Sequence, residues 1–181
     1  MALFSAACLD LGLANSQSTA PQSSKSALHR IYDEDQENRN EDARRLLRSE
    51  VRQLVAEDKV QTGEDYYYAA FIFQHGQKSE DYLYAHVLAV TALGKGFSPA
   101  KWLCAATLDR YLRSIKQPQI FGTQFGNGPA VYDMSPYDKD LLSDKIREVW
   151  CVASYTTQLK ISDDLKANKE FTSTRTCLLP D

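Results

Sequence analysis

The feature that most constrains the fold is a run of eight residues, 66–73, in which every side chain is aromatic or aliphatic. Thr62-Gly63-Glu64-Asp65 precedes the run as a variant capping box with two carboxylates in the first turn, and Gly76 follows it as a helix stop. The pattern therefore predicts a helix over residues 64–75. A helix that is apolar on nearly all sides has to be covered by other elements, so we expect it at the centre of the fold.

Helix signals, rather than the alternation typical of strands, recur along the rest of the chain. Residues 33–58 carry one apolar stripe, residues 79–93 follow a cap at Ser79, and residues 98–115 begin with Ser-Pro and stop before Pro118. The stripe of residues 33–58 is formed by Leu46, Leu47, Val51, Leu54 and Val55.

The chain becomes irregular at residues 117–132, which contain glycines and prolines, and two more helices are predicted after it. One runs from the Ser-Pro at residue 135 to about residue 152, and a short one starts at Ser162. Short connections make neighbouring helices antiparallel. The predicted fold class is all-α: a compact bundle of five or six helices, built from antiparallel hairpins, with an irregular loop after the fourth helix.

A length of 181 residues is typical of one domain, and we place a single helical domain at residues 29–170. Residues 1–28 are an apolar stretch followed by Ser, Gln and Pro, which indicates a disordered segment or the remnant of an export signal. Residues 171–181 are predicted as a tail. The compartment is open: cytoplasmic, or exported if an upstream signal was lost. The four cysteines have no CxxC spacing, so disulfide formation is open too.

Composition excludes several classes of function. The 21 basic and 24 acidic residues give a net charge of -3, which argues against nucleic-acid binding by bulk positive charge. No apolar run approaches the ~18 residues of a transmembrane helix. No zinc-ligand spacing, P-loop or nucleophile elbow is present, so we expect no metal or other cofactor. The mixed charges of residues 33–52 indicate a solvated face. The partner is an unknown small molecule or protein.

Two of the candidate catalytic residues are Asp109 and Arg110, which interrupt the otherwise apolar residues 102–112. Buried charges need partners, so the pair is either an ionic lock between helices or an acid/base or ligand-binding pair at the floor of a pocket. His75 ends the helix over residues 64–75, where it is either a cap or a general base. Gln74 precedes it as a candidate ligand-binding residue.

The loop adds three candidate ligand-binding residues, Gln119, Thr123 and Gln124. Their amides and hydroxyl can orient a polar ligand, or they can satisfy the backbone of the loop itself. Two successive antiparallel packings make the second and fourth helices parallel, with both C-termini at one end of the bundle. The loop is then expected to fold over His75 and to bring Gln119 or Gln124 near Arg110.

Three spaced blocks carry a resemblance: Phe73-Gln74-His75-Gly76, Leu108-Asp109-Arg110 and Pro118-Gln119-Ile120-Phe121-Gly122-Thr123-Gln124. Together with Asp35-Gln36-x-x-Arg39, they resemble a bacterial family known only as a domain of unknown function. The resemblance covers roughly residues 31–155 and implies a helical domain with a polar cluster, without an established activity. Two positions depart from the pattern of this family: Lys116 stands where the family has Gly, and Phe121 replaces the usual Tyr.

Two functions are compatible with these features. The first is a polar small-ligand or acid/base catalytic pocket that contains His75, Asp109 and Arg110, with an unknown substrate. The alternative is a noncatalytic helical interaction module, similar to tetratricopeptide repeats, in which the polar cluster is structural. A second copy at the ~34-residue period of such repeats is missing, which argues against a true repeat array.

Overall fold

The computed structural model describes residues 26–38, 40–126, 133–167, 169–170 and 173–177. Its fold is all-α, as predicted, and the described residues contain no β-strand longer than an isolated bridge. The elements are α1 (Ala27–Glu37), α2 (Glu41–Ala56), α3 (Gly63–Gln74), α4 (Ser79–Gly94), the 3-10 turn η1 (Ser98–Ala100), α5 (Lys101–Ser114), α6 (Asp144–Val149) and α7 (Tyr155–Lys166).

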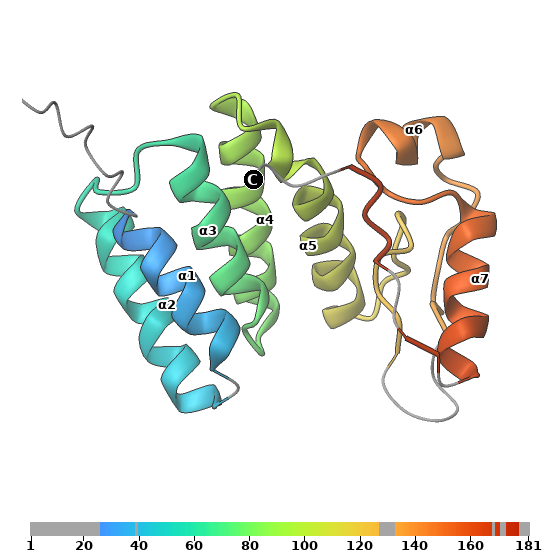
Figure 1. Ribbon diagram of the computed structural model, residues 1–181, viewed down its shortest axis with the longest axis horizontal. Helices are drawn as coiled ribbons and strands as arrows, with labels where there is room; N and C mark the ends of the chain where they lie inside the picture. Colours follow the sequence, from blue (N-terminus) through green and yellow to red (C-terminus); the bar gives the residue numbers. More distant parts are fainter. Residues whose placement is uncertain (1–25, 39, 127–132, 168, 171–172, 178–181) are drawn as a thin grey trace, which may run out of the picture.

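The helix α3 lies at the centre of the N-terminal part, as its apolar run predicts. It packs against α1 and α2 on one side and against α4 and α5 on the other (Figure 1). Ala69, Ala70, Ile72 and Phe73 have no exposed surface. Beyond α5 lie the irregular loop, α6 and α7 (Figure 1). Since α4 packs against both α3 and α5, it places the C-terminal ends of these two helices at the same end of the bundle.

The predicted helix over residues 33–58 is in fact two helices, α1 and α2. The break lies between Asn38 and Asn40, because both residues are extended and the Asn40 side chain caps α2 by accepting from the N–H groups of Asp42 and Ala43. The prediction that Leu46 belongs to the buried apolar stripe is wrong, because this residue is 69% exposed. Residues 1–25 of the predicted disordered segment lie outside the described residues, and Ser26 caps α1.

The predicted capping box at the start of α3 is confirmed: Thr62 and Asp65 exchange side-chain-to-backbone hydrogen bonds. Gly76 has a different role from the one predicted. It does not adopt a left-handed conformation, but a Cβ there would lie 2.4 Å from Cβ of Asp81, so only glycine allows this close approach. The predicted cap at Ser79 is also wrong, because Ser79 is the first residue of α4 and Lys78 precedes it without a side-chain cap.

The predicted helix over residues 135–152 is wrong for most of its length. Residues 136–138 instead pair with Gln119, whose N–H and carbonyl bond to Pro136 and Asp138. The helix in this region, α6, is capped by Ser143. The last helix also starts earlier than predicted: α7 is capped by Ser154, and Ser162 lies buried inside it.

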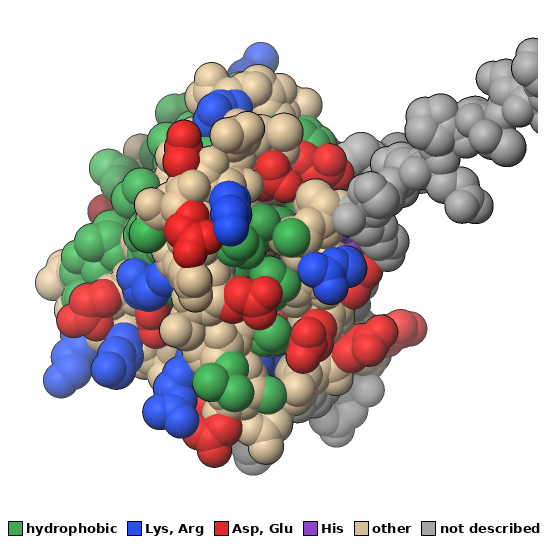
Figure 2. All heavy atoms as spheres, turned by 90° about the vertical axis from the view of Figure 1, so that its left-hand side faces the viewer, with side chains coloured by type: hydrophobic (Ala, Val, Ile, Leu, Met, Phe, Trp, Pro, Cys, Tyr) green, Lys and Arg blue, Asp and Glu red, His purple; other side chains and the backbone are tan. Residues whose placement is uncertain are grey.

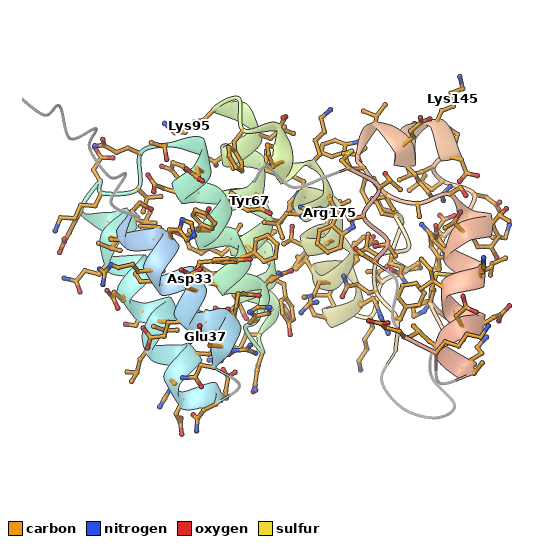
Figure 3. The ribbon with its side chains drawn as sticks, viewed as in Figure 1. Asp33, Glu37, Tyr67, Lys95, Lys145 and Arg175 are labelled. Atoms are coloured by element: carbon orange, nitrogen blue, oxygen red, sulfur yellow. A yellow bond between two sulfur atoms is a disulfide. The ribbon has the colours of Figure 1, made fainter. Side chains whose placement is uncertain are left out.

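Residues 173–177 fall within the predicted tail and form what we call the C-terminal strap. A disulfide joins Cys151 to Cys177, and the backbone of the strap pairs with residues 151–153 on either side of the bridge between Val152 and Arg175. Arg175 reaches from the strap towards Tyr67 (Figure 3) and donates to its hydroxyl at 3.4 Å and to the carbonyl of Pro99 at 3.2 Å. The strap therefore ties the C-terminal helices to the central bundle.

Lys116, the residue after the C-cap of α5, has a left-handed conformation with φ of +61°. A side chain in this region is strained by roughly 1–2 kcal/mol, whereas glycine is not. We therefore expect Lys116→Gly to raise the free energy of unfolding by about 0.5–1 kcal/mol, once the larger backbone entropy of glycine is included. Urea denaturation measures the change. The matched control is Lys95→Gly, at the C-cap of α4 with φ of -85°, which is expected to destabilise.

The surface beside α1 and α2 carries interleaved acidic and basic side chains (Figure 2). Arg45 and Asp42, for example, pair at 3.1 Å on the exposed side of α2. The predicted solvated face over residues 33–52 is wrong for two of its charges, because Asp35 and Arg48 are only 0% and 6% exposed. Of the helices in the described residues, none has both the length and the apolar character that crossing a membrane requires.

Candidate functional site

The polar residues selected from the sequence lie in a row that crosses the bundle at one end. Asp35 of α1 contacts His75 at the end of α3, at 2.5 Å between Oδ2 and Nδ1. The carbonyl of Gln74 accepts a hydrogen bond of 2.9 Å from Nη1 of Arg110 on α5. Asp109 then binds the loop that follows α5. Each block of polar residues is therefore joined to the next, from α1 through α3 and α5 to the loop.

Asp109 has no exposed surface, which confirms its predicted burial. Its predicted cationic partner is wrong. Oδ1 accepts from the N–H groups of Ile120 and Phe121, and Oδ2 accepts from the N–H and hydroxyl groups of Thr123, all within 2.8–3.0 Å. Burial raises the pKa of Asp109, and these hydrogen bonds oppose the rise. The carboxylate therefore shapes the loop, and both of its oxygens are occupied.

Two of the predicted ligand-binding residues serve the loop in the same way. Besides Thr123, the buried amide of Gln119 donates to the carbonyls of Gln124, at 2.8 Å, and Met134, and accepts from the N–H of Gln124 at 3.0 Å. Gly122, which lies between Gln119 and Thr123 in the sequence, has φ of +80°. A Cβ at this position would lie 2.2 Å from Oε1 of Gln158. The loop is thus fixed by internal bonds and by close packing, which is how a buried irregular segment satisfies its backbone.

A hollow of about 550 Å³ lies beside Arg110, between α4, α5 and the loop. This volume falls in the range of small-molecule sites. Gln124 is the one predicted ligand-binding residue of the loop that lines the hollow. The polar groups that line it include Ser79 and Tyr82 of α4, Arg110, Arg113 and Ser114 of α5, and Gln124.

Arg110 is the cation at the floor of this hollow. Among the described residues, Nη1 alone has an acceptor, the carbonyl of Gln74, and Nε is buried without a hydrogen-bond partner. Within the same part of the chain, no carboxylate forms an ion pair with Arg110, and the ring of Tyr82 lies 5.9 Å from its guanidinium carbon. Burial lowers the pKa of Arg110, and the neighbouring charge of Arg113 lowers it further, although arginine stays protonated at neutral pH.

His75 lies on the other side of this row of residues. Its ring is bound to Asp35, which is fully buried and also lies 3.6 Å from Nε of Arg44. Nη1 of Arg48 donates to the backbone carbonyl of His75 at 3.4 Å. The described residues that line the hollow do not include His75 or the buried Gln74. The structure thus joins Arg110 to the end of α3 and brings Gln124 to the same hollow, while His75 pairs with α1.

Several residues of the hollow are absent from the set selected from the sequence, chiefly Arg113, Ser79 and Tyr82. A signal for them exists: residues three apart on a helix share one face, which applies to Arg110 and Arg113 and to Ser79 and Tyr82. The fact that the two pairs face each other depends on how α4 packs against α5, which the sequence does not specify.

The described residues contain no cluster of three or more His, Cys, Asp or Glu side chains that could hold a metal ion. His86, for example, belongs to the packed core. Its Nδ1 lies 3.1 Å from the carbonyl of Cys104 in the packed interface between α4 and α5, and burial lowers its pKa. Its position is that of a hydrogen-bonded core histidine, as its place beside the apolar face of α4 indicates.

No family model, curated protein or solved structure matches the chain.

Proposed function

We propose that the protein binds a small anionic ligand in the hollow lined by Arg110, Arg113 and Gln124. The observation that carries this proposal is the state of Arg110, a largely buried guanidinium that lacks a carboxylate partner in the described residues. A buried cation is costly unless an anion and hydrogen-bond acceptors accompany it. Nη2 is the nitrogen suited to an anion in the hollow, because Nη1 is already bonded to the carbonyl of Gln74 and Nε is buried.

The arrangement favours binding over acid/base catalysis within the hollow. Its described lining residues include no imidazole and no carboxylate, so the usual proton acceptors near neutral pH are lacking there. Asp109 is adjacent in sequence, but the loop occupies both of its oxygens. His75, the candidate general base, is not among the described residues that line the hollow and is paired with Asp35 of α1.

The alternative function is a noncatalytic interaction module with a structural polar cluster. The saturated hydrogen bonds of Asp109, Gln119 and Thr123 favour it for these three residues. They do not account for Arg110, whose Nε remains without a partner in the described part of the chain. A folded protein that binds no anion at this position would support the alternative.

The proposal is tested by isothermal titration with sulfate on the wild type and on Arg110→Gln. We expect the substitution to weaken binding at least about tenfold, because a hydrogen bond to a charged group contributes roughly 1.5–3 kcal/mol. Arg110→Lys keeps the charge and loses the planar fork, so an intermediate affinity is expected. Arg45→Gln is the matched control: Arg45 is 72% exposed on α2, and its loss should leave binding unchanged. Equal sulfate affinities for wild type and Arg110→Gln, with both folded by circular dichroism, would exclude this site.

A further inference from the structure

We infer that the ligand is a phosphate monoester of a small hydroxylated compound, such as a sugar phosphate. The inference rests on the proposed function and adds the chemical class of the ligand. Two features of the hollow carry it: two guanidinium groups without a carboxylate among the described lining residues, and a separate set of polar groups that are left only as acceptors.

The charge of the hollow favours a dianion over a monocarboxylate. Arg110 and Arg113 occupy successive turns of one face of α5, and both line the hollow. A monoanion neutralises one of these charges, whereas a phosphate monoester carries about -1.5 to -2 at pH 7 and offers three oxygens. Three oxygens also provide acceptors for both guanidinium groups and for a hydroxyl such as that of Ser79.

The start of α4 adds to the positive character on this side. Ser79, the first helical residue, lines the hollow, and Lys78 before it makes no side-chain cap, so the first-turn N–H groups lack a capping side chain. Two carboxylates, Glu80 and Asp81, follow in the same turn. They line a different hollow, between α2 and α4, where Asp81 pairs with Arg52 at 3.2 Å.

The hollow also offers acceptors, from the loop and from the last residue of α5. Nε2 of Gln124 donates to the carbonyl of Ala106 and to the hydroxyl oxygen of Thr123, both at 3.2 Å, which leaves Oε1 to accept. The hydroxyl of Ser114 donates to the carbonyl of Tyr111 at 2.6 Å, so its oxygen is also left to accept. Such groups repel anionic oxygens and bind hydroxyl donors. The ligand therefore needs an anion at the arginines and hydroxyl groups towards the loop.

The experiment compares three probes by isothermal titration at pH 5 and pH 8: glucose 6-phosphate, inorganic phosphate and acetate. A phosphate monoester loses its second proton near pH 6. We therefore expect glucose 6-phosphate to bind about tenfold more tightly at pH 8 than at pH 5, in proportion to the dianion. Acetate has a single charge that is more than half complete at pH 5 and complete at pH 8, so its weaker binding should change by less than about twofold.

Acetate also controls for ionisable groups of the protein near Arg110. These are Tyr82 on α4, Asp109 and Arg113 on α5, and His75 and Asp81 around the end of α3. Of these, histidine is the one whose ordinary pKa lies in the range scanned. A change caused by His75 would move acetate and phosphate together, whereas a change caused by the ligand moves only the phosphates.

Two variants separate the parts of the inference. Arg113→Gln should reduce the preference for phosphate over acetate at pH 8 about tenfold, the size of one charge-assisted hydrogen bond. Gln124→Leu should weaken the binding of glucose 6-phosphate several-fold more than it weakens the binding of inorganic phosphate. If acetate binds as tightly as phosphate, or if phosphate binding is independent of pH, the inference that the ligand is a dianion is wrong. If glucose 6-phosphate binds no tighter than inorganic phosphate, the inference that the ligand carries hydroxyl groups is wrong. Absence of binding by all three probes would instead overturn the proposed function.

Discussion

Replacing Asp109 with alanine is expected to lower the free energy of unfolding by about 3–5 kcal/mol, because each buried donor left without a partner costs roughly 1–3 kcal/mol. The substitution removes the acceptors of three backbone N–H groups, from Ile120, Phe121 and Thr123, and of the Thr123 hydroxyl. Phe121 and Thr123 are buried, so water cannot readily replace the lost bonds. The loop should therefore lose its anchor on α5.

Urea denaturation measures this loss. Asp109→Asn is a useful second variant, because it keeps the volume but directs N–H donors at N–H donors, and we expect it to destabilise as well. Asp42→Ala is the matched control, since this side chain is 84% exposed and should change stability by no more than about 0.5 kcal/mol. An Asp109→Ala protein within this same limit would show that the loop does not depend on the carboxylate.

The parts of the fold that the sequence predicts best are those in which local and global signals agree. The run over residues 66–73 defines both the helix α3 and its central position, because its caps are local and its apolar surface needs cover on all sides. The burial of Asp109 follows from the apolar helix around it. The placement of the C-terminal ends of α3 and α5 at the same end of the bundle follows from two successive antiparallel packings, and it brings Arg110 within reach of the carbonyl of Gln74.

The partners of the site residues are not predictable in the same way. Asp109 is satisfied by backbone N–H groups 11 to 14 residues further along the chain, and every residue except proline has such a group. A cationic side chain is therefore the natural expectation, and it is wrong. The partner of His75 depends on α1, a helix that the break between Asn38 and Asn40 separates from α2. The sequence selects the polar residues but does not determine how they pair.

Two Ser-Pro pairs show how tertiary contacts override a local signal. Ser98-Pro99 leads directly through η1 into α5, as predicted. Ser135-Pro136 has the same local chemistry, yet residues 136–138 pair with the backbone of Gln119 and the chain stays irregular until Ser143. The loop that lines the hollow is thus held on both sides, by Asp109 and by these residues, so its position depends on segments far apart in the sequence.

The C-terminal strap supplies the second large effect: Cys177→Ser is expected to lower the free energy of unfolding by about 3 kcal/mol, which corresponds to roughly 6–12 °C in Tm for a domain of this size. The disulfide closes a loop with a sequence separation of 26 residues, which restricts the unfolded chain. In the folded state it holds Thr174, which is 1% exposed and accepts a hydrogen bond of 3.1 Å from Nε1 of Trp102.

Thermal unfolding with and without dithiothreitol tests this directly. The reductant should lower the Tm of the wild type to that of Cys177→Ser and leave the variant itself unchanged, because Cys104 is the other described cysteine and is free. A wild-type Tm that does not respond to dithiothreitol in the presence of denaturant would contradict a stabilising disulfide.

The strap contacts α5 at Trp102, and Val152 of the paired segment packs with Phe121 of the loop. Loss of the disulfide is therefore expected to weaken the support of the loop beside the hollow, in addition to lowering global stability.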